Sequence, residues 1–319
     1  MTDIVLATDL GGTNMRMAAV SRSGEILYRT KESTPRSHDG DAIIEAIVRM
    51  GTECRDNLVG ESLVAVAVAF PGAINSDTGK ISKAPNLPEL EGVTMSEVIK
   101  GHLGMEVIFE NDANAAAIGE HWLGASQGVD NSIMVTLGTG VGGGLILNGE
   151  ILRGPDGTAG EIGHINVEAE GVPCGCGSRG CVEQYSSASA VVRIAQELAA
   201  INPESELNKQ RDLTAEDAYR IAMKGDKTAS EVFRIQGYYL GIMLGGLVNT
   251  LNPEIIVIGG GAAASWELFY PPLMKEIKAR CYKEPAERVK ITRSELGDDA
   301  GILGGAKLGF KSVGHSYAT

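Results

Sequence analysis

A pattern of apolar segments interrupted by glycines occurs twice in this chain, and it constrains the fold more than any other feature. The first copy spans Ile4–Val20 and turns at Asp9–Asn14, and the second spans Ile133–Leu147 and turns at Gly138–Gly144. The copies lie about 125 residues apart, and each continues to a second turn and the tripeptide Glu-Ile-Leu. An apolar run, a glycine turn and a second apolar run are typical of a β-hairpin. The repeat therefore predicts two related halves, each of which opens with a hairpin.

Predicted strands and helices alternate along the rest of the chain. Leu63–Phe70 alternates large and small apolar residues, as a strand buried on both faces does. Two more strands are expected at Met105–Phe109 and Glu254–Ile258, and an alanine-rich helix at Ala113–Trp122. Further helices are expected over residues 41–57, 187–200, 214–224 and 228–251, and after Gly261 up to about Arg280. This mixture predicts an α/β protein with a cleft between two lobes, and the repeat places the lobe boundary near residue 110.

The composition is that of a globular protein, and it argues against several kinds of partner. The chain has 319 residues, of which 43% are hydrophobic and 22% charged, enough for two domains with cores of their own. The net charge of −13 argues against a nucleic-acid partner, because phosphate backbones attract basic surfaces. No apolar stretch approaches the roughly 18 residues that a membrane span requires. The first residues carry acids where a signal peptide carries bases, so we expect a cytoplasmic protein.

Three cysteines lie close together near the middle of the chain. Cys174, Cys176 and Cys181 fall within eight residues, and His164 precedes the first of them by ten. Three sulfurs and one nitrogen complete a tetrahedral zinc site, and the intervening glycines permit a tight loop. A disulfide with a spare thiol is one alternative, but five cysteines in 319 residues suit a reducing compartment. An iron–sulfur cluster usually requires four thiolates, and the other two cysteines are distant in sequence. We therefore expect a structural zinc ion.

The glycine turns match nucleotide-binding patterns to different degrees. Gly138–Gly143 fits the pattern G-x-G-x-x-G, but a dinucleotide site needs a helix next, and the sequence predicts a second strand. The glycines at 259–261 do precede a helix, but too little chain follows for a nucleotide-binding half and a catalytic domain. Consecutive glycine amides also form anion-binding turns, and Thr13 and Thr139 add a hydroxyl at each tip. One such turn indicates no more than a tight hairpin, but two turns and a third glycine junction favour a nucleotide bound between the lobes.

Asp112 is the candidate catalytic base. It lies where a predicted strand ends and a predicted helix begins, and Asp is a favoured helix N-cap that contributes about 1 kcal/mol. A carboxylate there also lies at the positive end of the helix dipole, and it can accept a proton from a hydroxyl group. In phosphoryl transfer, positioning and charge neutralisation dominate, so a weak base suffices. The residues alone leave cap and base as alternatives, and Asn111 beside Asp112 is suited to hydrogen-bond a diol.

Taken together, these motifs resemble those of the ROK family, which contains repressors and sugar kinases within the actin-like ATPase superfamily. Asp9–Asn14 and Leu137–Gly144 are similar to its two phosphate motifs. Glu161–His164 and Cys174–Glu183 are similar to its zinc signature. The resemblance extends from Asp9 to the glycines near residue 304, essentially the whole chain.

The resemblance implies a two-lobed, actin-like (ribonuclease-H-like) α/β fold with a central cleft. The small lobe is expected to comprise residues 1–110, with a C-terminal helix at 303–319 packing back on it. The large lobe is expected to comprise residues 111–302 and to carry the zinc loop.

The resemblance also implies a role for each matching residue. Asp112 would take the proton from the 6-hydroxyl of a hexose, and His164 would contact zinc with one nitrogen and a sugar hydroxyl with the other. The residues expected to bind the sugar are Gly72, Asn86, Asn111, Asp112, Glu161, His164 and Glu183. Those expected to bind ATP are Asp9, Gly11, Gly12, Thr13, Asn14, Gly138, Thr139, Gly140, Gly259 and Gly260, and Asp9 would position Mg²⁺. The expected zinc ligands are His164, Cys174, Cys176 and Cys181.

The implied activity is the ATP-dependent conversion of glucose to glucose 6-phosphate by a homodimer or a dimer of dimers. N-acetylmannosamine, N-acetylglucosamine, allose and fructose kinases of the family share these residues or nearly so, and polyphosphate is an alternative phosphoryl donor. The alternative from another class is a non-catalytic, sugar-sensing regulator. Repressors of the family carry a winged helix before the first phosphate strand, whereas that strand begins at Ile4 here. We therefore expect a hexose and ATP as partners, and neither nucleic acid nor a membrane.

Overall fold

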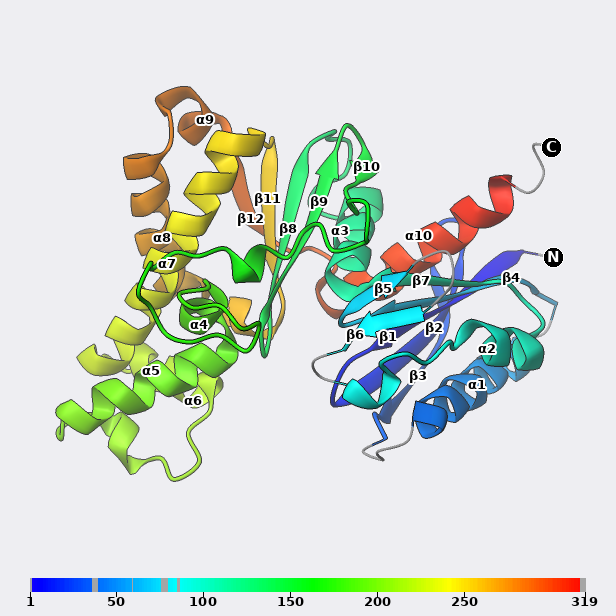
Figure 1. Cartoon of the computed structure of the whole chain (residues 1–319), viewed down its shortest axis with the longest axis horizontal. Helices are drawn as coiled ribbons and strands as arrows, with labels where there is room; N and C mark the ends of the chain where they lie inside the picture. Colours follow the sequence, from blue (N-terminus) through cyan, green and yellow to red (C-terminus); the bar gives the residue numbers. More distant parts are fainter. Residues whose placement is uncertain (1, 36–39, 59, 76–79, 85–86, 316–319) are drawn as a thin grey trace. The chain divides into compact units, whose positions relative to one another are not determined.

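The computed structural model describes residues 2–35, 40–58, 60–75, 80–84 and 87–315 (Figure 1). The chain forms two compact units. The first contains Met1–Asp130, Gly144–Gly160 and Ser294–Thr319, and the second contains Asn131–Gly143 and Glu161–Arg293. The lobe boundary expected near residue 110 stays a prediction, and α3 (Asp112–Leu123), which follows it, packs with the first unit.

The first unit is built on a five-stranded sheet with the order β3-β2-β1-β4-β7. The strands are β1 (Asp3–Leu10), β2 (Asn14–Ser21), β3 (Ile26–Ser33), β4 (Ser62–Phe70) and β7 (Val107–Asn111). β2 pairs antiparallel with β1 and β3, whereas β4 pairs in parallel with β1 and β7. Parallel pairing aligns the strand ends, so Asp9 is in register with Ala69, and Ala69 with Glu110. The first glycine turn and the start of α3 therefore lie at the same edge of this sheet.

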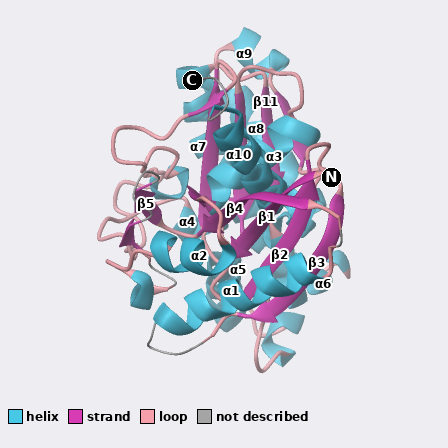
Figure 2. Ribbon diagram, turned by 90° about the vertical axis from the view of Figure 1, so that its right-hand side faces the viewer, coloured by secondary structure: helices cyan, strands magenta, loops and turns pink. Residues whose placement is uncertain are grey.

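Helices cover both faces of the first sheet. α1 (Gly40–Asp56) and α2 (Ser96–Leu103) pack on one face, and Figure 2 shows them lying across the strands. α10 (Ala300–His315) packs on the other face, on small residues that include Ala7 and Ala67 (Figure 1). α10 approaches this face closely because it carries glycine: a Cβ at Gly305 would already lie 3.4 Å from the Cβ of Ala67. A short hairpin of β5 (Ala73–Asn75) and β6 (Lys80–Lys83) follows β4.

A second five-stranded sheet has the order β10-β9-β8-β11-β12. Its strands are β8 (Ser132–Leu137), β9 (Val141–Leu147), β10 (Glu150–Ile151), β11 (Ile255–Gly259) and β12 (Lys290–Arg293). β9 pairs antiparallel with β10, and β11 pairs in parallel with β8 and β12. In both sheets, the order is third, second, first, fourth and fifth along the chain. This shared order confirms the two related halves that the glycine repeat predicts, and β3 and β10 both begin within a Glu-Ile-Leu tripeptide.

The helices of the second unit pack mainly on one another. They are α4 (Glu183–Ser186), α5 (Ala188–Ile201), α6 (Ala215–Met223), α7 (Lys227–Leu251), α8 (Trp266–Arg280) and α9 (Lys283–Arg288). α5, α6 and α7 share a core that includes Ile194, Ile221 and Phe233. α7 and α8 touch at Gly237, where a Cβ would collide with the carbonyl oxygen of Phe269.

The strands and helices that the sequence predicts are present, with ends shifted by a few residues. A 3₁₀ helix, η4 (Gly261–Ser265), separates the third glycine junction from α8, where the sequence predicts direct entry into a helix. The other 3₁₀ helices are η1 (Pro88–Leu90), η2 (Ile162–His164), η3 (Glu206–Lys209) and η5 (Gly297–Asp299). Elements that the sequence analysis does not predict include β3 and the shorter β5, β6, β12, α2, α4 and α9, and periodicity gives such short segments little signal.

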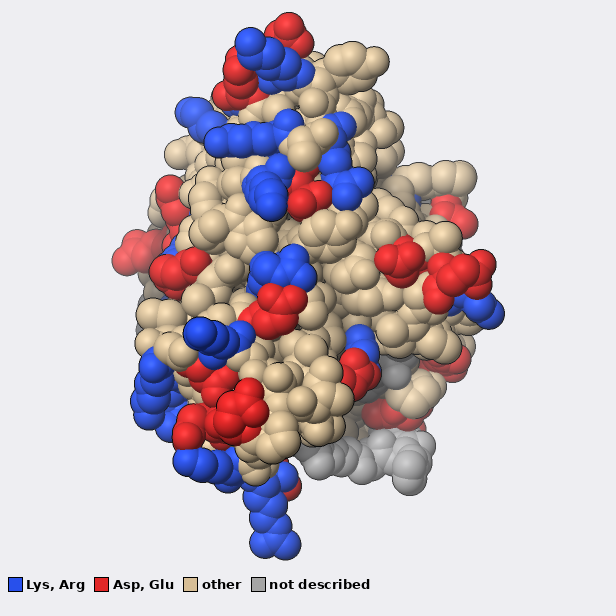
Figure 3. All heavy atoms as spheres, turned by 90° about the vertical axis from the view of Figure 1, so that its left-hand side faces the viewer, with Lys and Arg blue, Asp and Glu red and all other residues tan. Residues whose placement is uncertain are grey.

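Acidic and basic side chains form ion pairs on the surface. Figure 3 shows a face on which acidic and basic side chains adjoin one another. Ion pairs between exposed or partly exposed side chains of the second unit include Arg280–Glu276 and Arg234–Glu231. Across the part of the chain that the structure describes, every helix is too short or too polar to cross a membrane.

Candidate active site and metal centre

The candidate base lies at the junction of β7 and α3, as predicted, but it is not the helix cap. Asn111 is the N-cap residue, and its side-chain oxygen accepts hydrogen bonds from Ala113 N at 2.9 Å and Asn114 N at 3.1 Å. Asp112 is the first residue of α3, and its Oδ1 accepts from Ala113 N at 2.8 Å. The interpretation of Asp112 as the N-cap is therefore wrong. Its carboxylate nevertheless lies in the first turn, where the helix dipole favours a negative charge.

A buried carboxylate next to this junction was missed by the sequence analysis. Glu110 is 5% exposed, and its Oε2 accepts from Arg153 Nε at 2.8 Å and forms an ion pair with Nη2 at 2.6 Å. Its Oε1 accepts from Asn111 N at 3.1 Å and from Asn114 Nδ2 at 3.0 Å. Glu110 thus fixes both ends of the turn that carries Asp112. An acidic residue directly after the apolar run 107–109 was the available signal, because a charge that is buried there rarely lacks a partner.

Gly72 and Asn86 are two further residues that the resemblance assigns to sugar binding. Asn111 Nδ2 donates to the carbonyl oxygen of Gly72 at 3.3 Å, so the loop after β4 is brought to the start of α3. Asn86 lies outside the described residues.

The first glycine turn joins β1 to β2 and is held by a residue that follows β3. Gly11 N donates to Asn14 O at 3.0 Å and closes the turn. Thr34 then binds it twice: its hydroxyl donates to Gly11 O at 2.6 Å and its amide donates to Thr13 O at 2.9 Å. Gly12 and Thr13 are exposed at the tip. With these carbonyl groups engaged, the peptide planes of the turn are fixed.

Asp9 is the last residue but one of β1, where the first glycine turn begins. Burial raises the pKa of its carboxyl group above the ordinary value, Arg16 opposes that rise, and Asp298 adds to it. The nearest atoms of Arg16 and Asp9 are 4.0 Å apart, while Arg16 makes a 2.8 Å ion pair with Asp298. Asp9 is therefore a carboxylate whose negative charge is only partly compensated, which suits a divalent cation with oxygen ligands such as Mg²⁺.

The second glycine turn joins β8 to β9 and is held by the start of α5. Gly138 N donates to Gly140 O at 3.0 Å. Ala188 N donates to Gly138 O at 2.8 Å, and the Ser189 hydroxyl donates to Thr139 O at 3.0 Å. As in the first turn, an amide and a hydroxyl from outside the motif bind two carbonyl groups of the turn. Such turns can present their own amides to an anion.

The third glycine junction, Gly259–Gly260, follows β11. Gly259 is the last residue of the strand, and Gly260 has a φ of 86°, which favours glycine. A Cβ at Gly260 would also lie 2.8 Å from the amide nitrogen of Leu137, the last residue of β8. Glycine is therefore required here for both conformation and close approach.

Glu183 contacts the second glycine turn rather than standing apart from it. Its Oε2 accepts from Val141 N at 3.0 Å, and a Cβ at Gly140 would collide with the same oxygen. Glu161, the other acidic residue that flanks the cysteines, is exposed and precedes η2, where its carbonyl oxygen accepts from His164 N at 3.1 Å. The two acids thus have different environments, which the sequence does not reveal.

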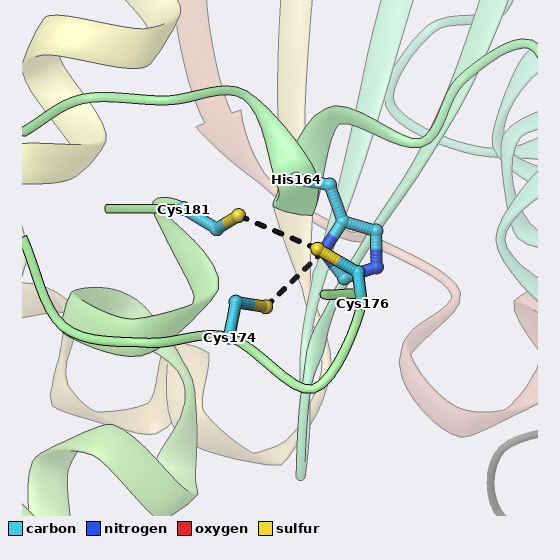
Figure 4. A group of neighbouring side chains, drawn as sticks. All are labelled: His164, Cys174, Cys176 and Cys181. Atoms are coloured by element: carbon cyan, nitrogen blue, oxygen red, sulfur yellow. Dashed lines mark hydrogen bonds between the residues drawn. The ribbon is translucent and has the colours of Figure 1, made fainter. Parts of the chain in front are cut away.

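The four predicted zinc ligands converge (Figure 4). One ligand atom from each of His164, Cys174, Cys176 and Cys181 lies within 4.8 Å of all the others. Cys174 Sγ is 3.6 Å from His164 Nδ1, and Cys176 Sγ is 3.7 Å from Cys181 Sγ. All five cysteines of the chain are free thiols, so the disulfide alternative is not realised here.

These distances fit a tetrahedral zinc site. With Zn–S of about 2.3 Å and Zn–N of about 2.0–2.1 Å, a regular tetrahedron has S–S edges of about 3.8 Å and S–N edges of about 3.6 Å. Cys181 is fully buried, and burial raises the pKa of its thiol to about 12. A hydrogen bond from the Ser178 backbone lowers the pKa of Cys176. A bound cation would favour the thiolate of Cys181 that burial disfavours, and Gln184 Nε2 already donates to Cys174 Sγ at 3.7 Å.

The predicted residues thus fall into two sets, one in each unit. The first unit contains Asp9, Gly11, Gly12, Thr13, Asn14, Gly72, Asn111 and Asp112. The second unit contains Gly138, Thr139, Gly140, Glu161, His164, Cys174, Cys176, Cys181, Glu183, Gly259 and Gly260. Within each unit, the structure brings loop ends together that are distant in sequence.

Known proteins are similar to this chain in sequence and in structure. The glucokinase of Halalkalibacterium halodurans is 38% identical over 95% of this chain and 94% of its own. The crystal structure of a ROK family glucokinase from Streptomyces griseus in complex with glucose and AMPPNP is similar with a TM-score of 0.83 and 31% identity, over 97% of this chain and 99% of that chain. The xylose repressor of Bacillus subtilis is 30% identical over 87% of this chain and 68% of its own.

The structural similarity confirms the predicted actin-like α/β fold. A sequence model of the ROK family matches residues 5–311, which include both glycine turns, the candidate base and the cysteine cluster. The motifs, the fold and the match over nearly the full length agree, and the chain therefore belongs to the ROK family.

Proposed function

We propose that this protein is a glucokinase, which transfers the terminal phosphoryl group of ATP to the 6-hydroxyl of glucose. The observation that carries the proposal is the similarity to glucokinases over nearly the whole length of both chains. The structure of one of these glucokinases contains glucose together with AMPPNP, an analogue of ATP. The xylose repressor is less similar and is covered over a smaller part of its length.

Asp112 is the proposed base that accepts the proton of the attacking hydroxyl. Its place in the first turn of α3 supports this role, because the helix dipole stabilises the carboxylate there. The N-cap of α3 is the side chain of Asn111, not that of Asp112. Asn111, Gly72 and Glu161 are proposed to position the sugar, as are His164 and Glu183. For His164, the ring nitrogen that faces the cysteines is Nδ1, so Nε2 on the other side of the ring remains for a hydroxyl group.

The two glycine turns are proposed to hold the phosphates of ATP, with Gly259 and Gly260 near the adenosine. The hydrogen bonds that the turn carbonyl groups accept from Thr34, Ala188 and Ser189 support this role. They fix the peptide planes, so the turns can present their amides to a phosphate without further reorganisation. Asp9 is proposed to position Mg²⁺, and its incompletely compensated charge supports that assignment. The magnesium ion would neutralise charge on the transferred phosphoryl group.

The Cys₃His cluster is proposed to hold a structural zinc ion. Its distances and donor atoms match a closed tetrahedral site, which leaves no coordination position for substrate. The ion would fix the loop that carries His164 and Glu183. We further propose that the protein acts in the cytoplasm as a homodimer, as the family resemblance implies.

A coupled ADP-release assay over a panel of hexoses tests the proposal. We expect glucose to be the preferred substrate and Asp112→Asn to lose several orders of magnitude in kcat while glucose still binds in a calorimeter. Asp56→Asn is the matched control, because Asp56 is an exposed acid at the end of α1, and its activity should equal that of wild type. Wild-type turnover by Asp112→Asn would refute the base. Sugar binding without ADP release from any hexose would instead favour the regulator.

A further inference from the structure

The backbone of Val141, at the end of the second glycine turn, contacts residues that lie close in sequence to two of the proposed metal ligands. Its N–H donates to Oε2 of Glu183 at 3.0 Å. Glu183 lies two residues after the ligand Cys181. The carbonyl oxygen of Val141 lies so close to Gly163, directly before the ligand His164, that a Cβ at Gly163 would collide with it. Residues close in sequence to the cysteine cluster therefore also contact the glycine turn.

The segment that leaves Cys181 binds the turn a second time. Val182 N donates to Ile165 O at 3.0 Å and ties the segment to η2, and Ser187 caps α5 through Ala190 N at 3.1 Å. From this capped end, Ala188 N and the Ser189 hydroxyl donate to the turn carbonyls of Gly138 and Thr139, at 2.8 and 3.0 Å. Cys181 and Val182 are fully buried, so the segment is fixed at its start as well as at its end.

We propose that Glu183 and Ser189 are positioning residues for the nucleotide's phosphate turn, and that they couple metal binding in the cysteine cluster to nucleotide binding. A metal bound by Cys181 and His164 would fix these two residues, whose neighbours Glu183 and Gly163 contact Val141, and Ser189 holds the tip of the turn. The proposal rests on the proposed function, because it requires the turn to bind the phosphates of ATP.

Two features separate this coupling from a general effect on stability. Three of the contacts reach the turn itself, at Gly138, Thr139 and Val141, and all of them lie within the second unit. Ser189 is exposed, so removing its hydroxyl leaves no cavity and should disturb the turn alone. Linkage also makes the coupling reciprocal: if the metal strengthens nucleotide binding by a factor, the nucleotide strengthens metal binding by the same factor.

The first arm of the test uses the zinc-loaded protein and measures Mg²⁺–AMPPNP and glucose binding separately by calorimetry. Loss of one neutral hydrogen bond predicts a Kd for AMPPNP that is about three- to tenfold higher in Ser189→Ala, with glucose affinity unchanged. Ser189→Thr retains the hydroxyl and should restore the affinity. Ser230→Ala is the matched control, since the Ser230 hydroxyl also donates to a backbone carbonyl, that of Asp226 at 2.8 Å, but at the start of α7 rather than at a glycine turn.

The second arm measures zinc affinity by competition with the chelator 4-(2-pyridylazo)resorcinol, with and without AMPPNP. We expect AMPPNP to raise zinc affinity in wild type and to raise it less in Ser189→Ala. Equal AMPPNP affinity in wild type and Ser189→Ala, or zinc affinity that ignores AMPPNP, would overturn the coupling while leaving the kinase intact. No AMPPNP binding by zinc-loaded wild type would overturn the proposed function and this inference together.

Discussion

Replacement of Arg153 by Met tests whether the buried pair with Glu110 supports the candidate base. Arg153 supplies two of the four hydrogen-bonding contacts that Glu110 receives, one at 2.8 Å and one at 2.6 Å. Without it, the Glu110 carboxylate stays inside the protein with only the Asn111 amide and the Asn114 side chain as donors. The uncompensated charge then lies two residues from Asp112.

The structure gives the size of the effect. Removing one partner of a fully buried ion pair costs about 3–5 kcal/mol, but the side chain of Arg153 is 34% exposed and water can replace part of it. We therefore expect a loss of about 2–3 kcal/mol in the free energy of unfolding. At about 2–4 °C per kcal/mol for a unit of this size, the melting temperature should fall by about 4–12 °C. We also expect kcat to fall by at least about tenfold, because the turn that carries Asp112 loses its anchor.

Differential scanning calorimetry and the ADP-release assay measure the two effects. Arg234→Met is the control for burial, because Arg234 binds Glu231 with two bonds of 2.7 Å but both side chains are exposed. Its cost should stay below about 1 kcal/mol. In the double variant Arg153→Met with Glu110→Gln, at least half of the lost stability should return, because the unpaired charge is gone. Equal losses in Arg153→Met and Arg234→Met, or no recovery in the double variant, would refute the reasoning.

Three further predictions follow from single positions. Burial raises the pKa of Asp9, so the charged form of its carboxyl group opposes folding above that pKa. Asp9→Asn should therefore melt at a higher temperature than wild type at pH 7.5, lose this gain below about pH 4, and lose ADP release with Mg²⁺–ATP. A lower melting temperature of Asp9→Asn at pH 7.5 would contradict the sign of this effect. Cys176→Ser should lower zinc content, measured by elemental analysis, together with the melting temperature, and a metal-free protein that melts and turns over like wild type would exclude the zinc site. Gly304→Ala should lower the free energy of unfolding, measured by chemical denaturation, by about 1–3 kcal/mol because its Cβ would collide with the Ala115 carbonyl. Gly246→Ala, which lies in open space on α7, should raise it by about 0.5–1 kcal/mol. Equal effects of the two substitutions would show that the close approach of α3 and α10 does not matter.

The sequence predicts features that depend on local patterns. The two hairpins follow from apolar runs around glycines, and the order of both sheets repeats as the internal repeat indicates. The cysteine cluster was also found from spacing, because its three thiols lie in one loop and only His164 comes from outside it. The register of a parallel sheet depends on distant strands, so the sequence does not show that Asp9 and Glu110 meet at one edge.

The choice between cap and base at Asp112 shows where local reasoning reaches its limit. Asn111 and Asp112 are both favoured N-cap residues, and a shift of one residue in the helix start exchanges their roles. The start is set by Glu110, whose carboxylate binds the Asn111 amide and the Asn114 side chain. Glu110 is in turn placed by Arg153, which lies 43 residues later in the chain. The helix start is therefore decided by a long-range ion pair that no capping rule contains.

The two glycine turns extend the same argument to anion binding. Glycine supplies conformational freedom, but a turn that binds phosphate without reorganisation must lose that freedom before the ligand arrives. In both turns the restriction comes from an amide and a hydroxyl outside the motif: Thr34 lies 23 residues from the carbonyl it binds, and Ser189 lies 50 residues from its own. The two halves share the order of their strands. The residues that hold the turns differ, because Thr34 follows a strand in the first half and Ser189 lies at the start of a helix in the second. A glycine motif therefore indicates where phosphate can bind, and we expect the affinity to depend on residues that the motif does not include.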